Sequence, residues 1–156
     1  MTVKIVEGDL LKSDCDVIIH QCNCFATQGA GIAKQISSRW AQVLEADKKY
    51  PIPVGSKERL GESSMASVEG DHGDMLVVNL YAQYKYGRGT QTDYDALRKG
   101  ISKVFFMVYM LAQPNIKIGL PYGMGAGLAG GDWEQVKSII EENTDRYSLN
   151  VYLYKL

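Results

Sequence analysis

The chain has 156 residues, of which 46% are hydrophobic and 22% charged, with only 4 prolines. This size and composition are typical of one globular domain over residues 1–156 and exclude a disordered or fibrous protein. Its 17 basic and 18 acidic residues give a formal net charge of −1, so a charged ligand must be recognised locally rather than by general attraction to nucleic acid or an anionic membrane.

The N-terminal segment carries charges at Lys4, Glu7 and Asp9 and so lacks the apolar run of a signal peptide. The longest apolar run, residues 104–112, is far shorter than the ~20 residues of a membrane-spanning helix, and we expect it in the core. An odd number of cysteines suits free thiols in a reducing compartment better than a disulfide framework. These cysteines are Cys15, Cys22 and Cys24. We therefore expect a cytoplasmic protein without membrane association.

The apolar residues predict strands that alternate with helices along the chain. Alternating or β-branched runs predict the strands 3–6, 17–20, 75–80, 116–120 and 149–154, and a weaker pattern predicts another over 61–68. This order favours an α/β domain whose central, largely parallel sheet is covered by helices on both faces.

Three segments show helical spacing. The first is predicted as one helix over residues 32–47, with an apolar stripe whose last position is the polar Asp47. The second runs over 93–112, and we expect Thr92 to cap it. The third begins at Asp132, an N-cap residue followed by Gln135 in the spacing of a capping box.

Glycines follow two of the predicted strands and lead directly into helices. The strand ending at His20 is followed by Gly29-Ala-Gly31, and the strand ending at Leu120 is followed by a turn rich in glycine up to residue 131. Glycine lets the backbone approach a ligand, and the first N–H groups of a helix attract anions. Two such turns predict a diphosphate site between them, although glycines can also serve only to form tight connections.

The segment Gly125-Ala-Gly127-Leu-Ala-Gly130 matches the dinucleotide fingerprint G-x-G-x-x-G. The fingerprint also needs an acidic residue about 20 positions further on, and residues 148–152 contain none. With no second mononucleotide-binding half before Leu156, we do not expect a dinucleotide-dependent dehydrogenase. No P-loop motif is present either.

The sequence resembles the macrodomain family, specifically the branch of ADP-ribose 1''-phosphate phosphatases and related ADP-ribosyl hydrolases. The resemblance spans nearly the whole chain. Its residues are Gly8-Asp-Leu10, His20-Gln-Cys-Asn-Cys24, Gly29-Ala-Gly-Ile-Ala33, Leu120-Pro121, Gly125-Ala-Gly-Leu128, Trp133 and the ending Val151–Leu156. It implies a three-layer α/β/α domain with about six strands that binds ADP-ribose or ADP-ribose 1''-phosphate without a cofactor.

The resemblance also implies residue roles. Asp9 would accept a hydrogen bond from the adenine amino group, the N–H of Leu10 would serve a ring nitrogen, and Tyr154 would stack on the adenine. The diphosphate and distal ribose would be lined by Gly29, Gly31 and Ile32 on one side and by Gly125, Ala126, Gly127 and Leu128 on the other. Without the resemblance, Asp9 is a turn or cap residue and Tyr154 a packing residue.

His20 and Asn23 are the candidate catalytic residues. Asn23 matches the family's asparagine at the distal ribose, and the ordinary pKa of His20, near 6.5, suits proton transfer. Each also has a structural alternative, since His20 could brace the loop and Asn23 could form a turn. A metal site is not expected, because zinc sites favour pairs of cysteines separated by two to four residues with a further ligand elsewhere, and His20, Cys22 and Cys24 do not have this spacing.

One departure from the family affects the expected reaction. The ester-cleaving hydrolases use an aspartate where this chain has Ala129, and their lysine matches Lys85 only loosely. We therefore expect hydrolysis of ADP-ribose 1''-phosphate to ADP-ribose and phosphate, with Lys85 and Arg88 either pairing with the terminal phosphate or simply solvated. The alternatives are a non-catalytic ADP-ribose reader, and a hydrolase acting on ADP-ribosylated protein or nucleic acid. A monomer is expected.

Overall fold

The computed structural model describes residues 3–87, 89–127 and 129–156, which form a six-stranded sheet in the order β1-β6-β5-β2-β4-β3. The strands in that order are β1 (Val3–Glu7), β6 (Asn150–Lys155), β5 (Lys117–Pro121), β2 (Val17–Cys22), β4 (Gly73–Tyr81) and β3 (Ser63–Gly70). Neighbours pair in parallel except β3, which is antiparallel to β4. The predicted α/β class and largely parallel sheet are confirmed, and the weakly predicted strand exists as β3.

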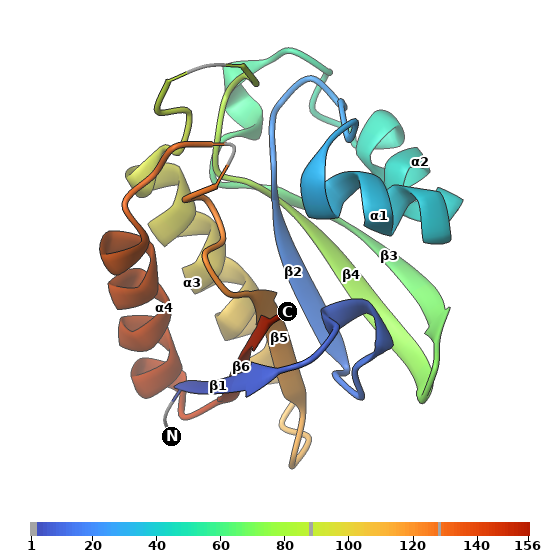
Figure 1. Cartoon of the computed structure of the whole chain (residues 1–156), viewed down its shortest axis with the longest axis vertical. Helices are drawn as coiled ribbons and strands as arrows, with labels where there is room; N and C mark the ends of the chain where they lie inside the picture. Colours follow the sequence, from blue (N-terminus) through green and yellow to red (C-terminus); the bar gives the residue numbers. More distant parts are fainter. Residues whose placement is uncertain (1–2, 88, 128) are drawn as a thin grey trace.

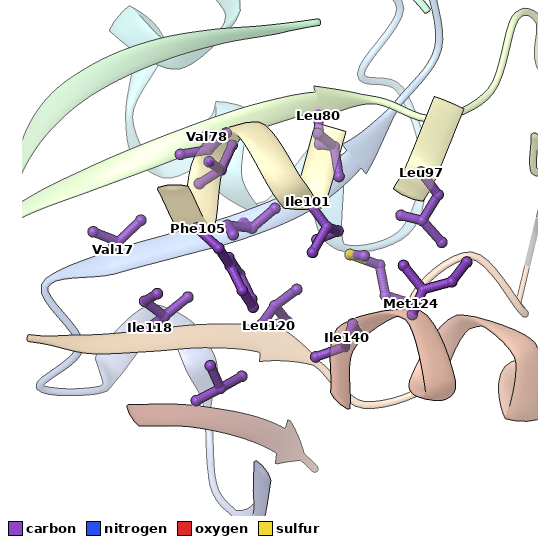
Figure 2. Packing of buried hydrophobic residues seen from close by; sticks show 14 of the residues in the cluster. Val17, Val78, Leu80, Leu97, Ile101, Phe105, Ile118, Leu120, Met124 and Ile140 are labelled. Atoms are coloured by element: carbon purple, nitrogen blue, oxygen red, sulfur yellow. The ribbon is translucent and has the colours of Figure 1, made fainter. Parts of the chain in front are cut away.

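Helices cover both faces of the sheet, giving three layers (Figure 1). One face carries α1 (Gly31–Arg39), α2 (Ala41–Lys49) and the short 3-10 turn η1 (Leu10–Lys12), and the other carries α3 (Tyr94–Met110) and α4 (Trp133–Tyr147). A second 3-10 turn, η2 (Lys57–Arg59), precedes β3. Ile18 and Ile19 point to opposite faces, since side chains alternate along a strand, and so belong to different core clusters. Figure 2 shows the cluster under α3 and α4.

The predicted helix over 32–47 is two helices, because Trp40 interrupts it. Trp40 has extended backbone angles, φ −129° and ψ 94°, and serves as the C-cap of α1 and the N-cap of α2. The residue is 5% exposed, and its indole Nε1 donates to the carbonyl of Glu69 in β3 at 3.0 Å. This hydrogen bond to the sheet holds Trp40 in an extended conformation, whereas the apolar stripe predicted a helical one.

The cap predicted for the second long helix is also wrong by one residue. Asp93, not Thr92, is the N-cap of α3, and its carboxylate accepts the N–H of Ala96. The Thr92 hydroxyl instead donates to the carbonyl of Gly125 at 2.6 Å. The cap predicted for α4 is confirmed, since the Asp132 carboxylate accepts the N–H of Glu134.

The apolar run over 104–112 is only partly core. Phe105 and Val108 are buried, whereas Phe106 and Tyr109 are 49% and 52% exposed and Met110 is 62% exposed. A helix against a sheet buries one stripe, so consecutive apolar residues cannot all face inward. Within the described ranges, no helix combines the length and apolar character needed to cross a membrane.

Candidate functional site

The parallel strands end at one edge of the sheet, and the predicted site residues lie in the last residues of these strands or in the segments that follow them. β2 and β5 are neighbours, but the helix after β2, α1, lies on one face and the helix after β5, α4, lies on the other (Figure 1). Ligands of open α/β sheets bind at such a switch point, outside the carboxyl ends of the strands. Two segments flank it: the first loop, residues 23–30, and the second loop, residues 122–132.

The Asn23 side chain shapes the first loop. Its Oδ1 accepts the N–H groups of Phe25 at 2.9 Å and Thr27 at 3.5 Å, and its Nδ2 donates to the Thr27 carbonyl at 2.9 Å. These bonds enclose Ala26, whose φ of +53° is in the left-handed region that non-glycine residues seldom adopt. The structure thus places Asn23 in the turn role that the sequence offered as its alternative.

His20 lies beneath the first loop with no exposed surface. Its Nε2 is 2.6 Å from Oδ1 of Asn79. Because Nδ2 of Asn79 donates to the carbonyl of Val43, Oδ1 must face His20, and we assign the imidazole proton to Nε2. Burial lowers the pKa of His20 to about 4, against smaller opposing effects of the Asn79 hydrogen bond and the Asp47 charge. His20 is therefore neutral near pH 7 and sits in the interior.

The neighbouring thiols are buried as well. Burial raises the pKa of Cys22 well above its ordinary value and raises that of Cys24 to about 11, so both remain protonated and are poor nucleophiles. All 3 cysteines are free, as predicted. Among the residues that the structure describes, no three His, Cys, Asp or Glu side chains are grouped so as to hold a metal ion.

The second loop consists of tight turns that are held by hydrogen bonds within the loop and by hydrogen bonds from the segment before α3. Gly125 has φ +79°, and its carbonyl accepts the N–H of Gly131 at 2.8 Å in addition to the Thr92 hydroxyl. The carbonyl of Ala129 accepts the N–H of Gln91 at 2.6 Å. Met124 reaches into the core under α3 and α4 (Figure 2). Ala126 and Gly127 lie in these turns, while the predicted contact residue Leu128 falls outside the described residues.

Two glycines in these loops are not explained by the protein's own packing. A Cβ added to Gly127 would meet no heavy atom within 4 Å, and one added to Gly29 would meet only the Thr27 methyl at 4.0 Å. Neither has a positive φ, in contrast to Gly125 and Gly31. The fold therefore tolerates alanine at Gly29 and Gly127, and the space beside each backbone is open.

The start of α1 is suited to an anion. Its N-cap residue is Ala30, whose methyl side chain cannot accept the first N–H groups of the helix. Those N–H groups carry the positive end of the helix dipole and follow directly on Gly29. Ile32, in the first turn, is half-buried against the core cluster under α1.

A second group of predicted residues meets where β1 and β6 end. Asp9 caps η1, with Oδ1 accepting the N–H of Leu11 at 3.0 Å, and a carboxylate can accept further hydrogen bonds. Tyr154 is paired in register with Val6, and its ring lies beside Gly8, about 3.8 Å from where a Cβ would be. The structure thus brings Asp9, Leu10 and Tyr154 together, and burial raises the pKa of the Tyr154 hydroxyl.

Lys85 is exposed in the segment after β4, beside the first loop, and its carbonyl accepts a hydrogen bond from Gln83. Arg88 lies outside the described residues. His72 is exposed in the turn between β3 and β4.

Sequence reasoning did not assign a function to Gln28, which joins the first loop to the interior. Its Nε2 donates to Oδ2 of Asp47 at 3.0 Å and to Oδ1 of Asn79 at 3.3 Å. The available signal was Asp47 itself, a carboxylate on the apolar stripe of a predicted helix. A charge in that position must have a buried partner, which the structure identifies as Arg59.

No family model matches the sequence. The chain is 29% identical over 152 residues to an uncharacterized 17.5 kDa protein from the tk-vs intergenic region of Enterobacteria phage T4, covering 96% of this chain and 94% of that one. Among solved structures, a Bacteroides thetaiotaomicron protein of unknown function is 26% identical with a TM-score of 0.83, over 100% of this chain and 99% of that chain.

Two further structures carry functional names. A macrodomain protein from Streptomyces coelicolor is 23% identical with a TM-score of 0.75, over 99% of each chain. Thermosipho africanus DarTG, solved in complex with ADP-ribose, is 17% identical with a TM-score of 0.77, over 98% of this chain and 41% of that chain. These likenesses cover the whole sheet and both helical layers.

Proposed function

The chain has the macrodomain fold, and from this premise we propose that it binds ADP-ribose across the carboxyl edge of its sheet. The groups for the two ends of such a ligand follow β1 and β2, which are three strand spacings, or about 14 Å, apart. Asp9 and Tyr154 would hold the adenine at one end. The distal ribose would lie near Asn23 at the other.

The observation that carries the proposal is the pair Gly29 and Gly127. They lie on opposite loops, and neither φ nor packing requires glycine at either position. Open space beside the backbone on both sides is what a diphosphate needs in order to approach main-chain N–H groups closely. The uncapped start of α1 supplies N–H groups beside one of the two glycines. The solved ADP-ribose complex of the similar DarTG structure is consistent with this ligand.

Calorimetry with ADP-ribose tests the binding proposal. We expect Gly29→Ala and Gly127→Ala each to weaken binding about tenfold or more, which is about 1.4 kcal/mol, because the added methyl group occupies ligand space. Their thermal midpoints should not fall below that of the unchanged protein, since the added methyl group meets at most the Thr27 methyl, at 4.0 Å. Ser38→Ala, at an exposed position of α1, is the control and should bind normally. No heat with ADP-ribose, or unchanged affinity in both glycine variants, would overturn the proposal.

We further propose that the protein hydrolyses ADP-ribose 1''-phosphate: the ester bond between the distal ribose and the phosphate breaks, and one water supplies the OH of one product and the H of the other, giving ADP-ribose and inorganic phosphate. Asn23 is the candidate to orient the substrate there. His20, buried and neutral, would support the loop instead of transferring the proton. Phosphate release from ADP-ribose 1''-phosphate is the assay. Asn23→Asp keeps the oxygen that holds the turn and removes the donor, so it should lose turnover with less disturbance of the loop than Asn23→Ala.

An ADP-ribose reader without turnover is the second candidate. It is favoured by the placement of His20 in the interior and by the engagement of the Asn23 amide within its own turn. Tight binding of ADP-ribose without phosphate release would select it. The third candidate, removal of ADP-ribose from modified protein or nucleic acid, rests on the exposed Lys85, and release of ADP-ribose from a glutamyl-ADP-ribosylated peptide would select that.

A further inference from the structure

A group of buried polar side chains lies beneath the first loop, and His20 is the one member that the sequence analysis assigned to the site. We call it the buried polar cluster. Its members come from β2, α2, η2, β3 and β4 and are each less than 9% exposed. They are His20, Asp47, Arg59, Ser64 and Asn79, with the hydroxyl of Tyr81.

An ion pair forms the centre of the cluster. Arg59 Nη1 lies 2.9 Å from Oδ1 of Asp47, and both side chains are fully buried. The same carboxylate oxygen accepts the Tyr81 hydroxyl at 2.7 Å, and Arg59 Nη2 donates to the Asp47 carbonyl at 3.0 Å. A buried ion pair often contributes no more to stability than apolar side chains of the same volume would. What this ion pair does provide is a fixed position for the Asp47 carboxylate.

Gln28 connects this geometry to the first loop. It is 7% exposed, and its amide donates to the second carboxylate oxygen of Asp47 and to Asn79. Asp47 is itself held by Arg59 and Tyr81, and Asn79 by the Val43 carbonyl. The two acceptors of Gln28 are therefore fixed independently of the loop.

Gln28 lies in the chain between the turn shaped by Asn23 and the start of α1. Asn23 shapes the beginning of the loop through bonds that end at Thr27. Gln28 follows immediately, and Gly29, Ala30 and the start of α1 come next. The backbone carbonyl of Gln28 also accepts the Ser37 hydroxyl at 3.4 Å, which ties the residue to α1.

We infer that Gln28 is a positioning residue, which holds Gly29 and the N-terminus of α1 in place for the ligand by anchoring them to Asp47 and Asn79. The link to a ligand rests on the proposed function. The anchoring of the loop by Gln28 is independent of the proposed function and can be measured without ligand.

The test compares two variants that each remove hydrogen bonds from the same cluster. Gln28→Met keeps the length of the side chain and loses both bonds from the loop. Ser64→Ala loses bonds to Tyr81 and Asn79, at 2.7 and 3.0 Å, without contacting the loop. We expect Gln28→Met to weaken ADP-ribose binding about tenfold, and Ser64→Ala to lower the thermal midpoint while leaving affinity within about twofold.

Hydrogen exchange without ligand is the second measurement. The backbone amides of residues 34–38, which are hydrogen-bonded within α1, should exchange at least about tenfold faster in Gln28→Met and at the unchanged rate in Ser64→Ala. Gln28→Ala repeats both measurements should the methionine side chain prevent folding. Unchanged exchange in both Gln28 variants, or equal effects of Ser64→Ala, would overturn the inference. If the unchanged protein does not bind ADP-ribose, the proposed function fails, and the exchange result alone decides the role of Gln28.

Discussion

Acidification should remove stability from this protein through His20. The imidazole has no exposed surface and faces the Asn79 carbonyl oxygen, the Cys22 thiol and, further off, the Asp47 carboxylate. Burial disfavours the protonated ring more than these acceptors favour it, which lowers the pKa from 6.5 to about 4 in the folded protein.

The sign and size of the effect follow from this difference. Between pH 6.5 and 4 the unfolded chain binds a proton at His20 that the folded chain does not, so acid favours unfolding. The stability is fully present above pH 6.5 and is lost as the pH falls toward 4. One pKa unit corresponds to 1.36 kcal/mol, which gives a loss of about 2 kcal/mol by pH 5 and about 3 kcal/mol by pH 4.

Urea unfolding at several pH values measures this loss. Carboxylates titrate in the same range, so the useful quantity is the difference in free energy of unfolding between the unchanged protein and His20→Gln, whose side chain does not titrate. That difference should shift by about 2 kcal/mol between pH 7.5 and 5 in favour of the variant. His72→Gln, in the exposed turn, is the control and should follow the unchanged protein. Parallel curves for His20→Gln would refute the assignment of a buried, neutral imidazole.

Two further substitutions test the packing described above. Arg59→Met leaves the buried Asp47 carboxylate without its cation and should lower the free energy of unfolding by about 3–5 kcal/mol in urea titrations; a loss under about 1 kcal/mol would contradict the ion pair. Gly131→Ala would place a Cβ 2.5 Å from the backbone oxygen of Gly125, so it should cost about 1–3 kcal/mol by the same measurement, whereas Gly127→Ala should cost nothing measurable.

Local patterns were sufficient for most elements of the fold. The apolar runs that predicted β2 and β4 are buried in the structure, and so is the apolar stripe that predicted α3. The break at Trp40 had no such signal. It depends on a hydrogen bond to Glu69, 29 residues further along the chain, and a partner at that separation is invisible to any local window.

The candidate site was predictable where it depends on backbone and less so where it depends on side-chain partners. Glycines at strand ends located both loops. Burial of His20, by contrast, depends on the position of β2 between β4 and β5, with α1 packed on β2 and α2 packed on β4, and no residue near His20 in the sequence indicates this packing. The anchor of Gln28 likewise needs Asp47 from α2 and Asn79 from β4.

The place of β6 in the sheet also orders events during synthesis. β6 lies between β1 and β5, and Val3 of β1 pairs in register with Val151, near the end of the chain. β1 therefore has no strand to join until residues 150–155 have left the ribosome, although β2, β4 and β5 can already associate. Asp9 follows β1 and Tyr154 lies in β6, so the first and second loops can form in the nascent chain before Asp9 and Tyr154 come together. A nascent chain whose residues 150–155 are still inside the ribosome, with everything before them outside, would have the two loops without the pairing of β1 and β6.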